Sequence, residues 1–103
     1  MIDLITRRQA DIEALCRRFH VRSLDVFGSA AEPGRFDRER SDIDFLVEFA
    51  PEAEERLAEL YLDLIAALHD LLERDVDVVM IRAIRNPYFR QVVERSRRTL
   101  YAA

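Results

Sequence analysis

Apolar residues recur at helical spacing through the first twenty positions of the chain. Ile5, Ile12, Leu15, Cys16 and Phe19 follow one another at close to whole helical turns, and arginines and acidic residues fill the positions between them. Residues three or four positions apart lie on the same face of an α-helix. The pattern therefore predicts an amphipathic helix over residues 3–19.

Three short runs rich in β-branched and aromatic residues predict strands, at residues 22–27, 42–49 and 75–81. Residues 30–41, rich in Glu, Pro, Gly, Arg and Asp, predict a loop with one helical turn. Between the second and third strands, apolar residues repeat on one helical face and predict a long helix over residues 53–73. The members of this face are Leu57, Leu60, Tyr61, Leu64, Leu68, Leu71 and Leu72.

A final helix is predicted to begin at Asn86-Pro87, because asparagine is a good N-cap and proline is favoured at the first helical position. We expect this helix to continue through Phe89, Val92, Val93 and Leu100. The resulting order of elements is α-β-loop-β-α-β-α. Such an order predicts an α/β (α+β) domain, with a small mixed sheet of three to four strands and helices packed on it.

The length of 103 residues predicts a single domain over residues 1–103. Half of the residues are hydrophobic, which is enough for a core but leaves little material for a deep substrate pocket. Any site is therefore expected in a surface cleft, or completed by a partner chain in a homo- or hetero-oligomer. The net charge of −4 gives no general attraction for nucleic acid. The chain contains neither a membrane-spanning apolar run nor a signal-peptide core, so we expect a cytoplasmic protein.

The residue types exclude several kinds of chemistry. All 16 basic residues are arginines, so no lysine is available for Schiff-base chemistry or for a Walker-type phosphate loop. Cys16 is the single cysteine and lies within a helical pattern. We expect it to be a buried core residue rather than part of a disulfide or a thiolate metal cluster.

The pair Asp42 and Asp44 opens the second predicted strand. Side chains at alternate positions of a strand project from the same face, so both carboxylates point to one place. Two such carboxylates raise each other's pKa unless a cation lies between them, and Mg²⁺ is the common cation where phosphate is also bound. Taken alone, the pair is also compatible with two solvated acids at a strand end.

Gly28-Ser29 ends the first predicted strand. Glycine lets a phosphate approach the backbone closely, and amide N–H groups with a serine hydroxyl suit phosphate oxygens. An ordinary strand-to-loop turn would have the same two residues.

Asp77 lies in the middle of the valine-rich third strand, where an acid is costly to bury unless it is paired or bound to metal. Asp75 lies at the entrance of the strand and is expected to be solvated. If the third strand lies beside the second, Asp77 joins Asp42 and Asp44. Three convergent carboxylates beside a phosphate-binding turn are typical of a two-metal phosphoryl-transfer site.

The combination of these motifs resembles the minimal nucleotidyltransferase (MNT) family of the polymerase-β-like superfamily. The resemblance rests on Phe27-Gly28-Ser29, on residues 41–47 (Ser-Asp-Ile-Asp-Phe-Leu-Val) and on residues 76–79 (Val-Asp-Val-Val), and it extends to the closing Leu100-Tyr101. It implies transfer of a nucleoside monophosphate, commonly AMP from ATP, to a hydroxyl with release of pyrophosphate. Some members of the family are antitoxins that adenylylate a partner HEPN-domain toxin on tyrosine.

The resemblance also implies roles for the motif residues. Asp42 and Asp44 would bridge two Mg²⁺ ions. Asp77 would bind the ion nearest the incoming hydroxyl, and would lower the pKa of that hydroxyl or accept its proton. Gly28 and Ser29 would hold the β- and γ-phosphates and so orient the α-phosphorus for in-line attack.

The chain departs from the family pattern after Ser29. Family members continue with a stretch like Arg-Ala-Arg-Gly, whereas this chain has Ala30-Ala31-Glu32-Pro33-Gly34 and a slightly longer loop. The loop also carries three arginines, which either replace the missing positive charge beside the triphosphate or form a solvated loop. These are Arg35, Arg38 and Arg40.

Two functions remain open at this point. One is an adenylyltransferase that modifies a partner toxin, and the other is a module of the same fold that neutralises its partner by contact. A small-molecule acceptor would need an added domain. Neither the acceptor, the preferred base nor the oligomeric state can be determined from the sequence.

Overall fold

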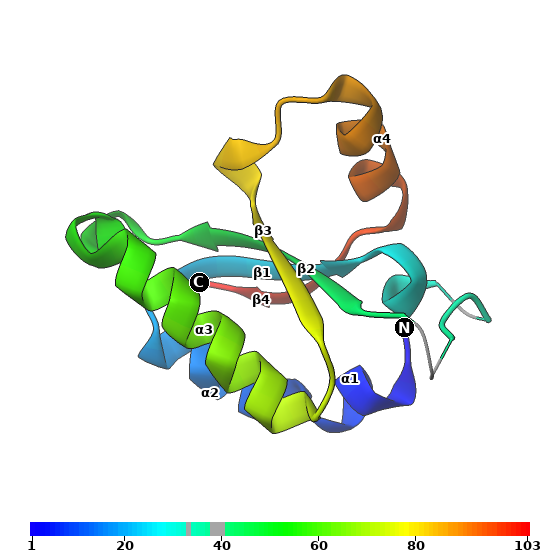
Figure 1. Cartoon of the computed structure of the whole chain (residues 1–103). Helices are drawn as coiled ribbons and strands as arrows, with labels where there is room; N and C mark the ends of the chain where they lie inside the picture. Colours follow the sequence, from blue (N-terminus) through cyan, green and yellow to red (C-terminus); the bar gives the residue numbers. More distant parts are fainter. Residues whose placement is uncertain (33, 38–40) are drawn as a thin grey trace.

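The protein is described by a computed structural model, which covers residues 1–32, 34–37 and 41–103. These described residues form four α-helices and four strands in the order α1-α2-β1-β2-α3-β3-α4-β4 (Figure 1). The helices are α1 (Asp3–Arg7), α2 (Gln9–Arg18), α3 (Leu57–Leu72) and α4 (Pro87–Ser96), and the strands are β1 (Val21–Phe27), β2 (Ile43–Phe49), β3 (Val76–Met80) and β4 (Arg98–Ala102). Short 3₁₀ helices η1 (Gly28–Ala31), η2 (Pro51–Arg56) and η3 (Ile81–Ala83) connect them.

The four strands form one mixed sheet in the order β3-β2-β1-β4. β1 pairs antiparallel with both β2 and β4, whereas β2 and β3 run parallel. A parallel neighbour requires a crossover connection, and α3 supplies it between β2 and β3. The prediction of a small mixed sheet with helices packed on it is confirmed.

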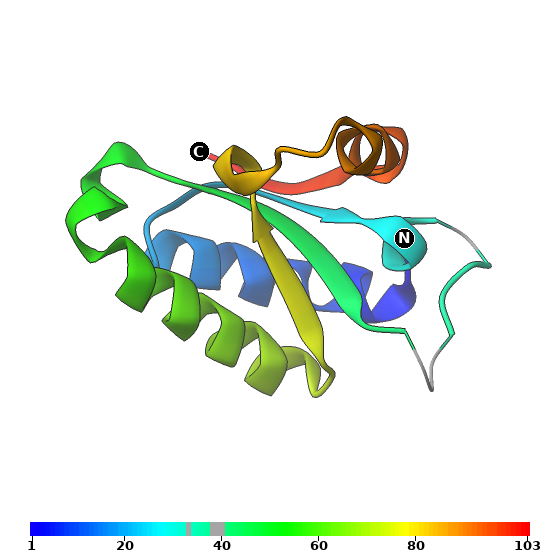
Figure 2. The same ribbon diagram turned by 45° about the horizontal axis from the view of Figure 1, so that its top comes forward.

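The main core lies between one face of the sheet and the helices α1, α2 and α3. Alternate residues of β2 contribute to it, since Ile43, Phe45 and Val47 are fully buried there. The helical stripe predicted from sequence contributes Leu64 and Leu68, which are also fully buried. Figure 2 shows α2 and α3 side by side under this face.

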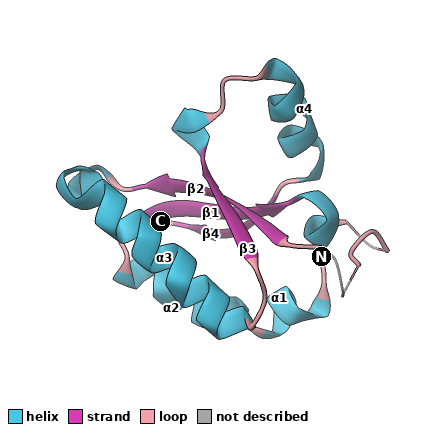
Figure 3. Ribbon diagram, viewed as in Figure 1, coloured by secondary structure: helices cyan, strands magenta, loops and turns pink. Residues whose placement is uncertain are grey.

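The opposite face of the sheet is only partly covered, by η3 and α4. A second, smaller core joins Phe27 of β1, Leu46 of β2 and Val93 of α4. Figure 3 shows α4 on the far side of the strands from α2 and α3. The start of β2 and β3 is left open on this face, and the candidate site lies there.

Three features of the fold differ from the sequence prediction. The leading helix is broken at Arg8, whose φ of −104° and ψ of 10° separate α1 from α2. The long helix begins at Leu57 rather than near residue 53, because the preceding turn from Pro51 is 3₁₀. Leu100 was predicted to belong to the last helix, but α4 ends at Ser96 and Leu100 lies in β4, where it is buried in the main core.

Other predictions are confirmed. The side chain of Asn86 caps α4 by accepting hydrogen bonds from the backbone N–H groups of Tyr88 and Phe89, and Pro87 occupies the first turn. Cys16 is fully buried, and burial raises the pKa of its thiol to about 12. Among the described residues, no helix has the length and apolar character needed to cross a membrane.

Candidate active site

Asp44 and Asp77 lie directly opposite each other on the neighbouring parallel strands β2 and β3. Each is the second residue of its strand, and the backbone bond from Ile43 N to Asp75 O (3.1 Å) fixes the register at this end. Residues paired across adjacent strands project from the same face of the sheet. The adjacency of the second and third strands, on which the grouping of these carboxylates depends, is thus present in the fold.

The two carboxylates face the open side of the sheet rather than the main core. Ile43 and Phe45 flank Asp44 along β2, and both are buried against the helices. Because side chains alternate along a strand, Asp44 projects to the other face together with Leu46. The same alternation places Asp77 on the face of Val79, which packs against the second core.

The electrostatics of Asp44 reflect its crowded position. The pKa of this carboxyl group is raised from 3.8 to about 6, first because it is partly buried, then because of the negative charges of Asp77 and Asp42. Within the described part of the chain, no arginine or histidine forms an ion pair with any of the three aspartates. Negative charge therefore gathers at this point, and none of the described arginines or histidines balances it with an ion pair.

The donor set fits Mg²⁺, a hard cation that takes oxygen ligands. Over the described ranges, however, no group of three or more His, Cys, Asp or Glu side chains forms a metal site by itself. Mg²⁺ in phosphate-binding sites is commonly held by one or two carboxylates, with substrate phosphates and water completing the octahedron. Asp44 and Asp77, with Asp42 beside them, are the residues that would hold it.

Gly28, which follows the neighbouring strand β1, lies against Asp44 on the open face. Phe27, the last residue of β1, pairs with Asp44, and the chain then turns into η1 with Gly28 at a φ of +71°. A Cβ added at Gly28 would lie 2.8 Å from Oδ2 of Asp44. Glycine is therefore required here both for its backbone conformation and for the close approach of the turn to the carboxylate.

Ser29 follows Gly28 and is half-buried. In the described part of the structure, its hydroxyl makes no hydrogen bond with another protein group. Its backbone carbonyl accepts a bond from Glu32 N (3.3 Å), which closes the 3₁₀ turn. The hydroxyl is thus available to an incoming ligand.

Ser96 contacts this turn and was not singled out by the sequence. The backbone N–H of Gly28 donates a hydrogen bond to Oγ of Ser96 (2.8 Å), although 68 positions separate the two residues. A serine at the end of a helix carries no sequence signal for such a contact. The next residue, Arg97, forms a 2.6 Å ion pair with Asp25, which is 2% exposed and lies two residues before Phe27.

Two charged residues that the sequence singled out are exposed. Asp77 lies on the open face of β3, so the cost of burying its carboxylate does not arise. Arg35, a candidate phosphate ligand, is exposed and paired with Glu32 at 2.5 Å. Arg38 and Arg40, the other two candidates, lie outside the described residues.

The altered stretch after Ser29 also has a structural explanation. Ala30 and Ala31 are both 0% exposed and pack in the main core. Their side chains therefore do not reach the open face, where the resemblance to the MNT family led us to expect arginine.

A mixed sheet that gathers carboxylates on its open face, beside a glycine turn suited to phosphate, is typical of enzymes that transfer groups from nucleotides. Comparison with known proteins identifies which one. Residues 12–100 match the family model of the nucleotidyltransferase domain. The chain belongs to this family, it has the polymerase-β-like fold, and within the family it is a minimal nucleotidyltransferase.

Two relatives come from Methanocaldococcus jannaschii, and each carries the assignment of a protein adenylyltransferase. One is 40% identical over 80 residues, which cover 78% of this chain and 76% of the relative. The other is 36% identical over 77 residues, which cover 75% of this chain and 74% of the relative.

Solved structures agree with this assignment. A protein described as a minimal nucleotidyltransferase is 36% identical and superposes with a TM-score of 0.72 over 94% of this chain and 95% of its own. A toxin–antitoxin complex with AMP-PNP is 25% identical, with a TM-score of 0.65 over 92% of this chain and 73% of its own. The fold is shared by an MNT antitoxin complex with the tri-AMPylated HEPN toxin of Shewanella oneidensis, at 22% identity, a TM-score of 0.64 and coverage of 95% and 72%.

Proposed function

We propose that the protein transfers AMP from ATP to a hydroxyl group of a partner protein, in a reaction that depends on Mg²⁺. The observation that carries the proposal is the pairing of Asp44 with Asp77 across β2 and β3, with Asp42 adding its charge to the same point. The names of the archaeal relatives support a protein acceptor and an adenylyl group. We place the reaction in the cytoplasm, where ATP is made and used.

Each residue of the site has a role in this reaction. Asp42 and Asp44 would hold the metal ions, and Gly28 and Ser29 would hold the β- and γ-phosphates. Two bound Mg²⁺ ions would neutralise charge on the triphosphate and on the leaving pyrophosphate. The acceptor oxygen attacks the α-phosphorus, the bond from that phosphorus to the oxygen that joins it to the β-phosphorus breaks, and pyrophosphate leaves. Asp77 would accept the proton of the acceptor hydroxyl, or would hold an ion that lowers the pKa of that hydroxyl so that its proton passes to water.

A tyrosine of a HEPN-type toxin is the acceptor that we propose, which makes the protein an antitoxin. The support is the solved complex in which an MNT antitoxin is bound to an AMPylated HEPN toxin. We propose that the partner itself completes the site, since a domain of this size has little material to enclose an acceptor.

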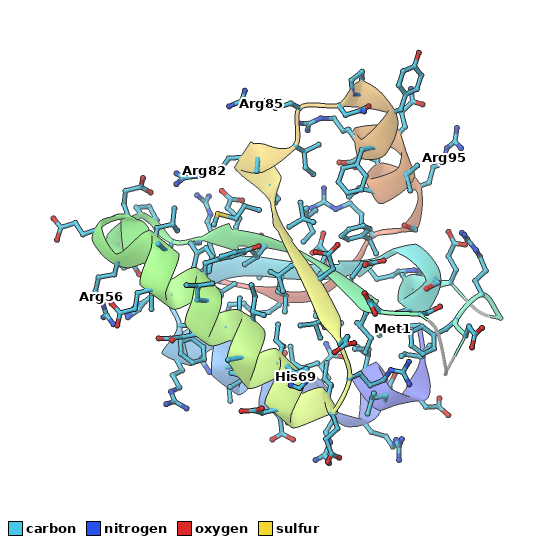
Figure 4. All side chains as sticks on the ribbon, viewed as in Figure 1. Met1, Arg56, His69, Arg82, Arg85 and Arg95 are labelled. Carbon is cyan, nitrogen blue, oxygen red and sulfur yellow. The ribbon has the colours of Figure 1, made fainter. Side chains whose placement is uncertain are left out.

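The surface around α4 has the character of a protein contact. Tyr88 and Val92 are 78% and 53% exposed on this helix. Figure 4 shows Arg82, Arg85 and Arg95 around the same part of the molecule. Exposed apolar residues with arginines at their rim are typical of the centre of protein interfaces. We therefore place the partner on the α4 side, next to the open face of the sheet.

The test uses ATP labelled at either the α- or the γ-phosphate. The protein is incubated with Mg²⁺ and a HEPN-type toxin protein, and the toxin is then separated and its label counted. We expect label on the partner from α-labelled ATP only, and no label when Asp42 or Asp44 is replaced by Asn. Transfer of the γ-label, or transfer that survives either substitution, would overturn the proposal.

The alternative function is a binding module that neutralises the partner by contact alone. It is favoured by one observation, the burial of Ala30 and Ala31 in the stretch where the family resemblance implies arginines. A stable complex with the partner that forms equally well without ATP, and leaves it unlabelled, would support this alternative.

A further inference from the structure

The buried hydroxyl of Ser96 connects the last turn of α4 to the Gly28-Ser29 turn through hydrogen bonds. Oγ of Ser96 accepts the N–H of Gly28 at 2.8 Å, and the same hydroxyl donates to the backbone carbonyl of Val92 at 3.2 Å. Ser96 is 6% exposed, so water has little access to replace either bond. Both hydrogen-bonding capacities of the hydroxyl are therefore used, and its orientation is fixed.

The hydrogen bond to Ser96 matters because Gly28 is in a backbone conformation that glycine alone does not hold firmly. Gly28 has a left-handed φ of +71°, and its Cα lies so close to Asp44 that no side chain fits between them. Glycine has a wide choice of backbone conformations, so the residue that needs this conformation is also the one least able to hold it alone. The hydrogen bond to Ser96 supplies the restraint.

A second contact from the neighbouring residue holds the helix end in place. Nε of Arg97 donates to Oδ2 of Asp25 at 2.6 Å, and Nη1 of Arg97 donates to Glu94 at 2.9 Å. Asp25 belongs to β1, the strand that leads directly into Gly28. The end of α4 thus contacts both the strand and the turn that follows it, which prevents Ser96 from moving independently of Gly28.

We propose that Ser96 is a positioning residue for nucleotide binding. Its hydroxyl fixes the peptide of Gly28, and so keeps the hydroxyl of Ser29 aligned with the β- and γ-phosphates while the turn stays against Asp44. The inference rests on the proposed function, because it assumes that the Gly28-Ser29 turn holds those phosphates. Ser96 itself touches neither metal nor nucleotide.

The experiment measures binding of two probes by calorimetry in the presence of Mg²⁺. One is an ATP analogue with a methylene group between the α- and β-phosphates, which cannot be transferred, and the other is AMP, which lacks the phosphates that the turn contacts. We expect Ser96→Ala to weaken binding of the analogue about tenfold, as the loss of one buried hydrogen bond allows. The affinity for AMP should change less than twofold. Ser96→Thr keeps the hydroxyl and should therefore bind the analogue with close to wild-type affinity.

Asn86→Ala is the matched control. It removes the cap at the other end of α4 and loosens the helix without touching Gly28. We expect it to lower the melting temperature but to leave both affinities within twofold of wild type. If Ser96→Ala does not fold, Ser96→Cys provides the same comparison, because it keeps the shape of the side chain with a weaker acceptor.

The possible outcomes distinguish failure of the proposed role of Ser96 from failure of the proposed function. If wild type and Ser96→Ala bind the analogue with equal affinity, the role of Ser96 is overturned, but the proposed function is not. The role of Ser96 is also overturned if Asn86→Ala lowers the affinity for the analogue as much as Ser96→Ala does, because the effect would then come from the stability of α4. Wild type that binds neither probe overturns both the role of Ser96 and the proposed function.

Discussion

Gly28 and Asp44 are in such close contact that a methyl group on the glycine would lie 2.8 Å from the carboxylate oxygen. This contact brings the turn after β1 against the acidic residue at the start of β2. The two features that the proposed reaction needs, a phosphate-binding turn and metal-binding carboxylates, are therefore held at a fixed separation by the sheet itself.

Gly28→Ala should reduce both nucleotide binding and stability. The alanine would have an unfavourable left-handed φ and would push against Asp44 Oδ2, so we expect at least about a tenfold loss of affinity for the methylene ATP analogue. Gly34→Ala is the control, since Gly34 has a φ of +77° but nothing within 4 Å of an added Cβ. It should cost about 1 kcal/mol in unfolding free energy and leave the affinity unchanged. If Gly28→Ala and Gly34→Ala bind the methylene ATP analogue with equal affinity, the contact between Gly28 and Asp44 has no role in nucleotide binding.

Asp77→Asn should abolish transfer of AMP without unfolding the protein. Asp77 is exposed at the edge of the sheet, so the isosteric change should leave the melting temperature within a few degrees of wild type. We expect a fall of at least about a hundredfold in the rate of label transfer, the usual size of a lost acid–base or metal-binding group. Asp75→Asn, two residues earlier and also exposed, should transfer AMP at the wild-type rate. Comparable losses in both variants would exclude a specific role for Asp77.

The stability of the metal-free protein should fall as the pH rises through about 6. The pKa of Asp44 is about 6 in the folded protein and 3.8 in its ordinary state, so the folded protein binds the extra proton between these values. The contribution is fully present below pH 3.8 and is lost above pH 6. Asp44→Asn should therefore match wild type near pH 4 and exceed it by about 1 kcal/mol at pH 7.5, once solvent screening of the half-buried group is allowed for.

Urea titrations in EDTA at the two pH values measure this difference. Addition of Mg²⁺ at pH 7.5 should then stabilise wild type and not Asp44→Asn, because binding to the folded state alone raises stability. A variant that is less stable than wild type at pH 7.5 would show that Asp44 has a structural partner rather than uncompensated charge.

Arg97→Ala should be strongly destabilising. Asp25 would remain buried without its partner, and removal of one member of a buried ion pair costs about 3 kcal/mol. Arg98→Ala is the control from the adjacent position, where the side chain is exposed and has no ion pair among the described residues; its effect should stay within about 0.5 kcal/mol. Chemical denaturation would measure both, and a loss below about 1 kcal/mol for Arg97→Ala would show that Asp25 gains water or another partner.

Much of the fold was predictable because its elements are locally encoded. The stripe from Leu57 to Leu72 and the Asn86-Pro87 cap each specify a helix through nearby residues alone. β4 was not predictable, because residues 98–102 follow a helix without glycine or proline and become a strand only by pairing with β1. The break at Arg8 likewise depends on packing, since the apolar spacing continues across it.

The site was predictable in part for the same reason. The sequence predicts that Asp42 and Asp44 share one face of a strand, but β2 begins at Ile43, so strand geometry places Asp44 only and Asp42 lies just before the strand. The approach of Asp77 depends on which strand lies beside β2, and the sequence leaves that as a condition that the sheet order then meets. The bond from Gly28 to Ser96 joins residues 68 positions apart and had no local signal at all.

The most direct test of the central claim is a crystal structure with Mn²⁺ and the methylene ATP analogue, read by the anomalous signal of the metal. We predict metal within bonding distance of the carboxylates of Asp42 and Asp44, with Asp77 on the ion nearest the α-phosphate and the β- and γ-phosphates against Gly28-Ser29. Triphosphate bound elsewhere, or metal bound without any of the three aspartates, would contradict the account.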